Sequence, residues 1–146
     1  MLPAFTDAGL LPEGLHRATW DEVAERFGCT RRRSRLLAGL LEAATNLRDA
    51  GARYLWLDGS FTTTKPDPDD YDCAWDAQGV DLSRVDPVLV DPVDIRNGRF
   101  RQKAKYGGEF LVGHEASSGM PFQLYFQQDQ DGHTKGVVLL DLRTLP

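Results

Sequence analysis

The chain has few cysteines, no long apolar run and no excess of positive charge, and each absence excludes a class of protein. Cys29 and Cys73 are its only cysteines, too few for a disulfide framework and too far apart for a thiolate metal site. No apolar run approaches the roughly 20 residues that span a membrane. The first residues lack the charged and apolar regions of a signal peptide. We therefore expect a cytoplasmic protein with no membrane partner.

The balance of charge is acidic, with 17 Lys and Arg against 22 Asp and Glu and a net charge of -5. This argues against the broadly basic surface of a protein that coats nucleic acid, although a local basic patch can still bind nucleotides or RNA. The 146 residues, of which 41% are hydrophobic, are enough to form one core. Because no internal repeat or long linker is evident, we predict a single domain over residues 1–146.

Two helices are predicted in the first third of the chain. Residues 1–19 show no sustained hydrophobic period and are expected to form an extended arm. Thr19 and Glu22 have the spacing of a capping box, which predicts a helix over 20–27. Leucines at helical spacing then predict a longer helix from Thr30 to about residue 50, the most distinct element in the sequence.

Four arginines, Arg31, Arg32, Arg33 and Arg35, stand at the start of the longer helix. Two helices with a basic second member can form a helix-turn-helix, in which the second helix enters the DNA major groove. The leucine stripe and the acidic net charge instead favour core packing with a solvated arginine end. DNA binding stays a third hypothesis, which requires the arginines to share an exposed face clear of the leucines.

Beyond Gly51 the pattern changes to short apolar runs, which predict a sheet-containing core over 51–146. The runs most typical of strands are 54–57, 71–75, 122–126 and 136–142. Asp81–Val90 can form a short helix limited by prolines, whereas Asp94–Ser118 is basic and interrupted by glycines. The order of elements predicts an α/β (α+β) domain whose helical part covers 20–50.

The residues that indicate chemistry lie at two successive predicted strands. Gly59-Ser60 ends one strand, and after nine residues Asp70-Tyr71-Asp72 opens the next. Alternation along a strand places Asp70 and Asp72 on the same face, where they repel each other unless a cation lies nearby. Magnesium prefers such hard oxygen ligands together with substrate phosphates. Gly59 allows close approach of the backbone to a phosphate, and Ser60 offers a hydroxyl and, if a helical turn follows, backbone donors.

A structural explanation competes with this one, because aspartates near proline are common in turns. A lone Asp-x-Asp is usually structural, and a lone Gly-Ser is weaker still. Their combination in the order strand, Gly-Ser, loop, Asp-x-Asp, strand favours a functional site. Lys65, in the intervening loop, is either a phosphate ligand or a solvated side chain.

The spacing from Gly59-Ser60 to Asp70-Tyr71-Asp72 resembles the signature of the nucleotidyltransferase superfamily, the polymerase-beta-like fold. The segment from Leu11 to Trp20 is similar to the lead-in of a group of small bacterial proteins within it. The resemblance implies a small mixed sheet with helices packed on one face. It also implies that Asp70 and Asp72 hold Mg²⁺ or Mn²⁺, and that Gly59 and Ser60 bind the triphosphate of an NTP.

The reaction implied by the resemblance is attack of a hydroxyl on the α-phosphate of the NTP, which releases pyrophosphate and transfers an NMP to an unidentified acceptor, RNA or protein. Active members usually add a third carboxylate from a later strand. The expected strand, 122–126, would place Gln123 at that position, and a neutral amide cannot replace an acid. Glu109, Asp129, Asp131 and Asp141 stay open as substitutes.

An alternative of a different class therefore stands beside the enzyme. It is a catalytically weak or inactive member of the fold that binds a nucleotide or a protein partner, as an antitoxin-like module does. The basic stretch 96–105 either binds an RNA or nucleotide acceptor or forms a charged surface loop. His16, His114 and His133 show no metal-ligand spacing, and no Ser-His-Asp or Cys-His set is evident.

Overall fold

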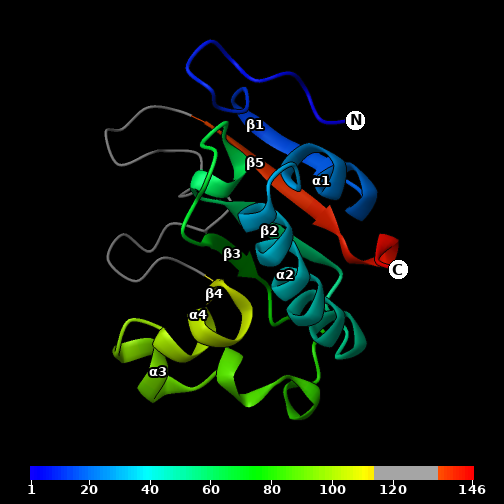
Figure 1. Ribbon diagram of the computed structural model, residues 1–146. Coiled ribbons are helices and arrows are strands. Elements are labelled where there is room, and N and C mark those ends of the chain that lie inside the picture. The colour runs from blue at the N-terminus through cyan, green and yellow to red at the C-terminus, as the bar shows by residue number, and fades with distance from the viewer. Residues whose placement is uncertain (114–134) are drawn as a thin grey trace.

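A computed structural model describes residues 1–113 and 135–146 (Figure 1). The strands are β1 (Gly14–Ala18), β2 (Tyr54–Asp58), β3 (Tyr71–Trp75), β4 (Gly108–Val112) and β5 (Gly136–Asp141). The helices are α1 (Trp20–Phe27), α2 (Arg31–Asp49), α3 (Pro92–Arg96) and α4 (Phe100–Tyr106). Short 3-10 turns are η1 (Ser60–Thr62), η2 (Leu82–Arg84), η3 (Pro87–Leu89) and η4 (Leu142–Thr144).

The strands form one mixed sheet in the order β1-β5-β2-β3-β4. The outer pairs, β1 with β5 and β3 with β4, are parallel, whereas β2 is antiparallel to both of its neighbours. Figure 1 shows α1 and α2 over one face of this sheet. The expected α/β fold, a small mixed sheet with helices packed on one face, is confirmed.

Local capping signals set the starts of α1 and α2. The Thr19 hydroxyl accepts a hydrogen bond from the Glu22 N–H at 3.2 Å, and the Thr30 hydroxyl accepts one from the Arg33 N–H at 3.1 Å. Each bond satisfies a backbone donor that lacks a partner within its helix. The predicted stripe of α2 packs in the core: Leu36, Leu37, Leu40, Ala44 and Leu47 are buried, and Leu41 is partly buried against them.

The two faces of the sheet have different neighbours. Leu55 and Leu57 of β2 belong to the main core that α1 and α2 help to form. Trp56, between them, packs in a separate small cluster with Ala74 and Val137 on the opposite face. Because side chains alternate along a strand, Asp58 at the end of β2 lies on the same side as Trp56, away from these two helices.

Two predictions of local structure were wrong. The expected arm over 1–19 contains the edge strand β1, which pairs with β5 far along the chain. The helix expected over 81–90 is replaced by the turns η2 and η3, because prolines interrupt it. No element was predicted in the weakly patterned segment 94–118, whose described residues, 94–113, contain α4 and β4. The predicted strand 122–126, with Gln123, lies outside the described residues.

No helix within residues 1–113 and 135–146 combines the length and the apolar character needed to cross a membrane.

Arg33 is buried, so the prediction of a solvated arginine end was wrong at this position. Its guanidinium donates hydrogen bonds to the carbonyl oxygens of Phe27 at 3.3 Å, Phe61 at 2.6 Å, Thr63 at 2.7 Å and Lys65 at 2.6 Å. The last three carbonyls belong to the loop that follows β2. Arg33 therefore fixes this loop against the first turn of α2.

We expect Arg33→Met to lower the free energy of unfolding by at least about 3 kcal/mol, because it leaves several buried carbonyl groups without a donor. Urea unfolding followed by circular dichroism measures the loss. Arg32→Met, at the exposed neighbouring position, is the matched control and should change stability by no more than about 0.5 kcal/mol. Equal effects of the two substitutions would show that the bonds of Arg33 do not support the fold.

Candidate functional site

Three carboxylates lie side by side across three strands. In the sheet register, Asp58 of β2 is paired with Asp72 of β3, and Asp72 is paired with Glu109 of β4. Side chains directly opposite in an antiparallel pair, such as Asp58 and Asp72, have β-carbons about 4.5–5.5 Å apart on one face of the sheet, and the parallel register of β4 brings Glu109 beside Asp72. We call these three residues the carboxylate row. Asp70 precedes β3, and its negative charge acts on Asp72.

Gly59 brings the backbone after β2 against the centre of the row. A β-carbon at Gly59 would lie 2.9 Å from Oδ2 of Asp72 and 3.3 Å from its backbone nitrogen. Gly59 also has φ 86° and ψ -172°, a conformation essentially restricted to glycine. Glycine is thus required here for two reasons, backbone conformation and contact with Asp72.

Ser60 is half-buried and begins η1, which is only three residues long. The helical turn expected after Ser60 is therefore present, but it is too short to supply a helix dipole. Hydrogen bonds from the Thr62 and Thr63 hydroxyls to the carbonyl oxygens of Gly59 and Ser60 hold the turn in shape.

The carboxylate row concentrates negative charge where it is poorly solvated. Burial, followed by the charges of Glu109, Asp70 and Asp58, raises the pKa of Asp72 to about 7. Burial also raises the pKa of Asp58 to about 6, although Lys135 acts in the opposite direction. Burial raises the pKa of Asp70, with Lys103 opposing the shift. Removal from water disfavours the charged form of each acid, and like charges add to this effect.

Two lysines offset the outer members of the row. Lys103 of α4 forms an ion pair with Glu109 at 3.1 Å, and Lys135, directly before β5, forms one with Asp58 at 3.1 Å. Within residues 1–113 and 135–146, no lysine or arginine forms an ion pair with Asp72. The central carboxylate is therefore the one that a bound cation would stabilise most.

The structure brings together some of the residues that the sequence suggested. Gly59 contacts Asp72 directly, and Asp70 lies close enough for its charge to raise the pKa of Asp72. Lys65 is exposed in the loop, with its charge acting on Asp70. Among the acids left open as the third carboxylate, Glu109 is paired with Asp72 and Asp141 forms an ion pair with Arg143, whereas Asp129 and Asp131 lie outside the described residues.

Sequence reasoning missed three residues of the site: Asp58, Lys103 and Lys135. Asp58 directly precedes Gly59 at the end of a predicted strand, a position that could have been noticed. No local signal distinguishes the two lysines, because their partners are set by the packing of α4 and β5.

The chemical type of the ligands at this site is suitable for magnesium. All of the acids offer hard oxygen ligands and an excess of negative charge. No three carboxylate, histidine or cysteine side chains within the described ranges converge closely enough to hold one ion. Magnesium, however, is commonly bound through one or two carboxylates and substrate phosphates, and Asp70 with Asp72 can supply these two.

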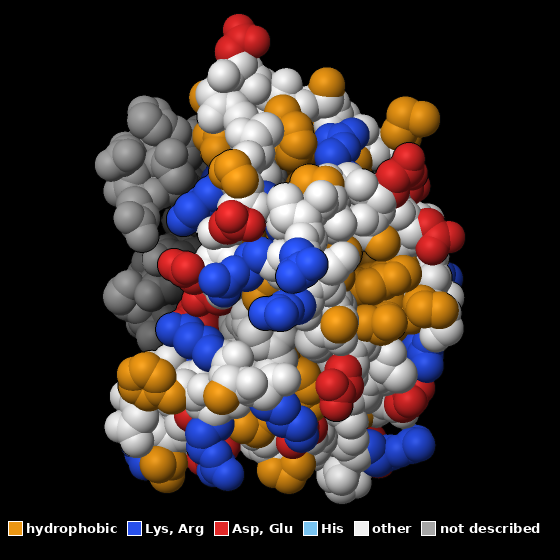
Figure 2. Space-filling model, in the orientation of Figure 1, with side chains coloured by type: hydrophobic (Ala, Val, Ile, Leu, Met, Phe, Trp, Pro, Cys, Tyr) orange, Lys and Arg blue, Asp and Glu red, His pale blue; other side chains and the backbone are white. Residues whose placement is uncertain are grey.

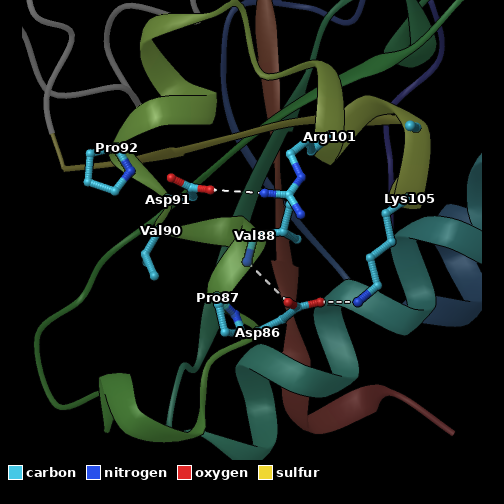
Figure 3. Close-up of a pocket in the computed structure, with 9 residues that line it drawn as sticks. Asp86, Pro87, Val88, Val90, Asp91, Pro92, Arg101 and Lys105 are labelled. Atoms are coloured by element: carbon cyan, nitrogen blue, oxygen red, sulfur yellow. Dashed lines mark hydrogen bonds and ion pairs between the residues drawn. The ribbon is translucent and has the colours of Figure 1, made fainter.

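A cavity of about 800 Å³ lies elsewhere, between η3, α3 and α4. Figure 3 shows two ion pairs at its wall, from Arg101 to Asp91 and from Lys105 to Asp86. None of the carboxylate row lines this cavity. The cavity and the carboxylate row are therefore separate features of the described residues, and the row, at one end of the sheet, is the candidate site.

A family model described as "Family of unknown function (DUF6932)" matches residues 3–141, nearly the whole chain. Comparison with curated proteins and with solved structures finds no match. The family carries no assigned activity, so the resemblance to nucleotidyltransferases stays a prediction.

Gly59→Ala should lower the free energy of unfolding by about 1–3 kcal/mol from backbone strain, and further because its methyl group displaces the Asp72 carboxylate. Gly79→Ala is the matched control, since Gly79 has φ 77° but no neighbouring atom within 4 Å of the position that a β-carbon would take. Chemical denaturation of both variants compares the two losses. If Gly79→Ala costs as much, contact with Asp72 adds nothing to the requirement for Gly59.

Asp72→Asn should stabilise the metal-free protein at pH 8 by about 1–3 kcal/mol. The folded state keeps a proton on Asp72 up to about pH 7, whereas the unfolded state loses it near pH 4. Deprotonation of Asp72 therefore lowers the free energy of unfolding as pH rises from about 4 to 7. Asparagine does not titrate, so the variant does not lose this stability. Melting temperatures at pH 5 and pH 8 measure it, with Asp76→Asn as an exposed control. A variant less stable than the native protein at pH 8 would make Asp72 a structural anion.

Proposed function

The chain belongs to the DUF6932 family, and we propose that it is a magnesium-dependent nucleotidyltransferase, which transfers an NMP from an NTP to the hydroxyl of an acceptor. The observation that supports this most directly is the carboxylate row beside Gly59. Asp72, unpaired with lysine or arginine in the described residues, is flanked by Glu109 from the adjacent strand. In this proposal Glu109 serves as the third carboxylate that the resemblance implies.

Each residue of the site has a role in this proposal. Asp70 and Asp72 hold the magnesium ion, for which manganese can substitute. Gly59 keeps the Asp72 carboxylate in place, and the Ser60 hydroxyl and the Lys65 ammonium contact the triphosphate. Glu109 orients the acceptor hydroxyl and accepts its proton.

The metal, when bound, polarises the α-phosphate and neutralises charge that develops on it. The remaining contributions come from the chain itself and are those of positioning and electrostatics. Lys103 and Lys135 contribute to this electrostatic stabilisation. Both lie beside the carboxylate row, and their ammonium groups can move from a carboxylate to a phosphate of the NTP. The proposal places the protein in the cytoplasm, where NTPs and magnesium are available together.

A second candidate is a catalytically weak or inactive member that binds a nucleotide or a protein partner, in the manner of an antitoxin. The observation that favours it is the pairing of Glu109 with Lys103 and of Asp58 with Lys135. A lysine that stays on Glu109 keeps that carboxylate from accepting a proton. The acids would then bind a nucleotide through magnesium without completing the reaction.

Incubation of the purified protein with each α-³²P-labelled NTP, magnesium and a cell extract tests the two candidates. We expect label transfer that falls by roughly 100-fold or more in Asp70→Ala and in Asp72→Ala, because each removes a charge that stabilises the transition state. Asp76→Ala, at the exposed position after β3, should transfer label at the native rate.

Absence of transfer from every NTP, combined with magnesium-dependent nucleotide binding, would contradict the enzyme and support the binding module. Transfer that survives both alanine substitutions would contradict the site itself. Calorimetric titration with each NTP, with and without magnesium, supplies the binding measurement.

A further inference from the structure

Three arginines at the start of α2 project from the surface. Arg31, Arg32 and Arg35 are exposed, and none forms an ion pair with an acid in the described part of the chain. Leu36, Leu37 and Leu40 of the same helix are buried. These three arginines therefore share a surface clear of the leucines, as the DNA-binding hypothesis required. We call them, together with the exposed Lys65, the basic patch.

Most lysine and arginine side chains elsewhere on the molecule already contact an acidic side chain or an aromatic ring. Ion pairs with aspartate or glutamate are formed by Arg48, Lys103, Lys105, Lys135, Arg101 and Arg143. Arg17 and Arg53 lie over the ring of Tyr54. In a chain with a net charge of -5, the basic patch is thus a local exception. Asp67 and Asp69, exposed in the neighbouring loop, offset part of its charge.

Hydrogen bonds connect the helical turn of the basic patch to the loop that joins β2 to β3. Arg33, within the same helical turn, binds the carbonyl oxygens of Phe61, Thr63 and Lys65. The Thr30 hydroxyl donates to the Pro66 carbonyl at 3.4 Å. The loop held in this way runs from Gly59 to Asp70. In Figure 2, Lys and Arg side chains gather over the N-terminal turns of α2, with Asp and Glu side chains next to them.

We infer that the basic patch binds the phosphate backbone of a polynucleotide whose terminal hydroxyl is the acceptor of the transferred nucleotide. The inference rests on the proposed function, since the reaction requires an acceptor hydroxyl near the carboxylate row. Arginine contacts phosphate with paired N–H donors in a fixed geometry. Arg31 and Arg35, four residues apart, lie on one helix face, so they can contact successive phosphates.

The overall charge of the chain favours one orientation of such a ligand. A polyanion is repelled by most of an acidic surface and attracted to its basic patch. Bound there, a strand can extend along the loop after Gly59 toward the acids, where its end meets the metal and the NTP. An acidic polypeptide would be attracted by the same charges, but it presents single carboxylates instead of a regular series of phosphates.

Fluorescence anisotropy with a short fluorescein-labelled RNA, and with DNA of the same sequence, tests the inference. We expect the variant with Arg31→Gln, Arg32→Gln and Arg35→Gln to bind the preferred strand at least about 10-fold more weakly than the native protein. The slope of log affinity against log salt concentration should fall by roughly 2, since about 0.7 unit is lost for each phosphate contact in a single strand.

The matched control carries Arg48→Gln, Arg53→Gln and Arg84→Gln, which remove equal charge at the other end of α2, about 25 Å away. We expect its affinity to stay within about twofold of native, because charges at this distance are screened. Circular dichroism verifies that both variants fold. Native protein that binds neither strand, equal weakening in both variants, or equally tight competition by polyglutamate would overturn the inference.

Magnesium-dependent NTP binding, measured by calorimetry on the same proteins, separates this inference from the proposed function. We expect the patch variant to bind Mg-NTP as the native protein does. Native protein that binds NTP but no polynucleotide would overturn the inference and leave the proposed function intact. If the native protein binds a polynucleotide through the patch but binds no NTP, the patch is a polynucleotide-binding surface and the proposed transferase activity is contradicted.

Discussion

The pairing register of β2, β3 and β4 is the constraint on which the candidate site depends, because it sets Asp58, Asp72 and Glu109 side by side. A slip of one residue would move a carboxylate to the face covered by the helices. Like charges at neighbouring positions destabilise a sheet, and Lys103 and Lys135 offset only the outer two. Within residues 1–113 and 135–146, the central carboxylate of Asp72 thus has no ion pair with lysine or arginine.

The loop after β2 contacts two parts of the molecule, the first turn of α2 and the carboxylate row. From the helix side, Arg33 holds its carbonyl groups; at its start, Gly59 lies against Asp72. Because a buried guanidinium loses strong hydrogen bonds if it is displaced, the loop has little freedom to move. The exposed arginines of the same helical turn are therefore held beside this loop.

Elements with strong local signals could be predicted from the sequence. Thr19 and Thr30 cap the helices as expected, and the leucine stripe of α2 is buried. β2, β3 and β5 coincide with short apolar runs. β1 could not be predicted, because as an edge strand with alternating burial it depends on pairing with β5. α4 was missed because its first turn follows Arg99 in a left-handed conformation, without a side-chain cap.

By itself, the sequence determined the local order around the candidate site: a glycine-serine bend ends one strand, and Asp70 and Asp72 stand at the start of the next. Only the tertiary structure decided which acid joins them. Glu109 is distant in sequence, and its place beside Asp72 depends on strand pairing that no local pattern encodes. The burial of Arg33 has the same origin, since its partners are carbonyl groups of a loop about thirty residues away, which folding alone brings within hydrogen-bonding distance.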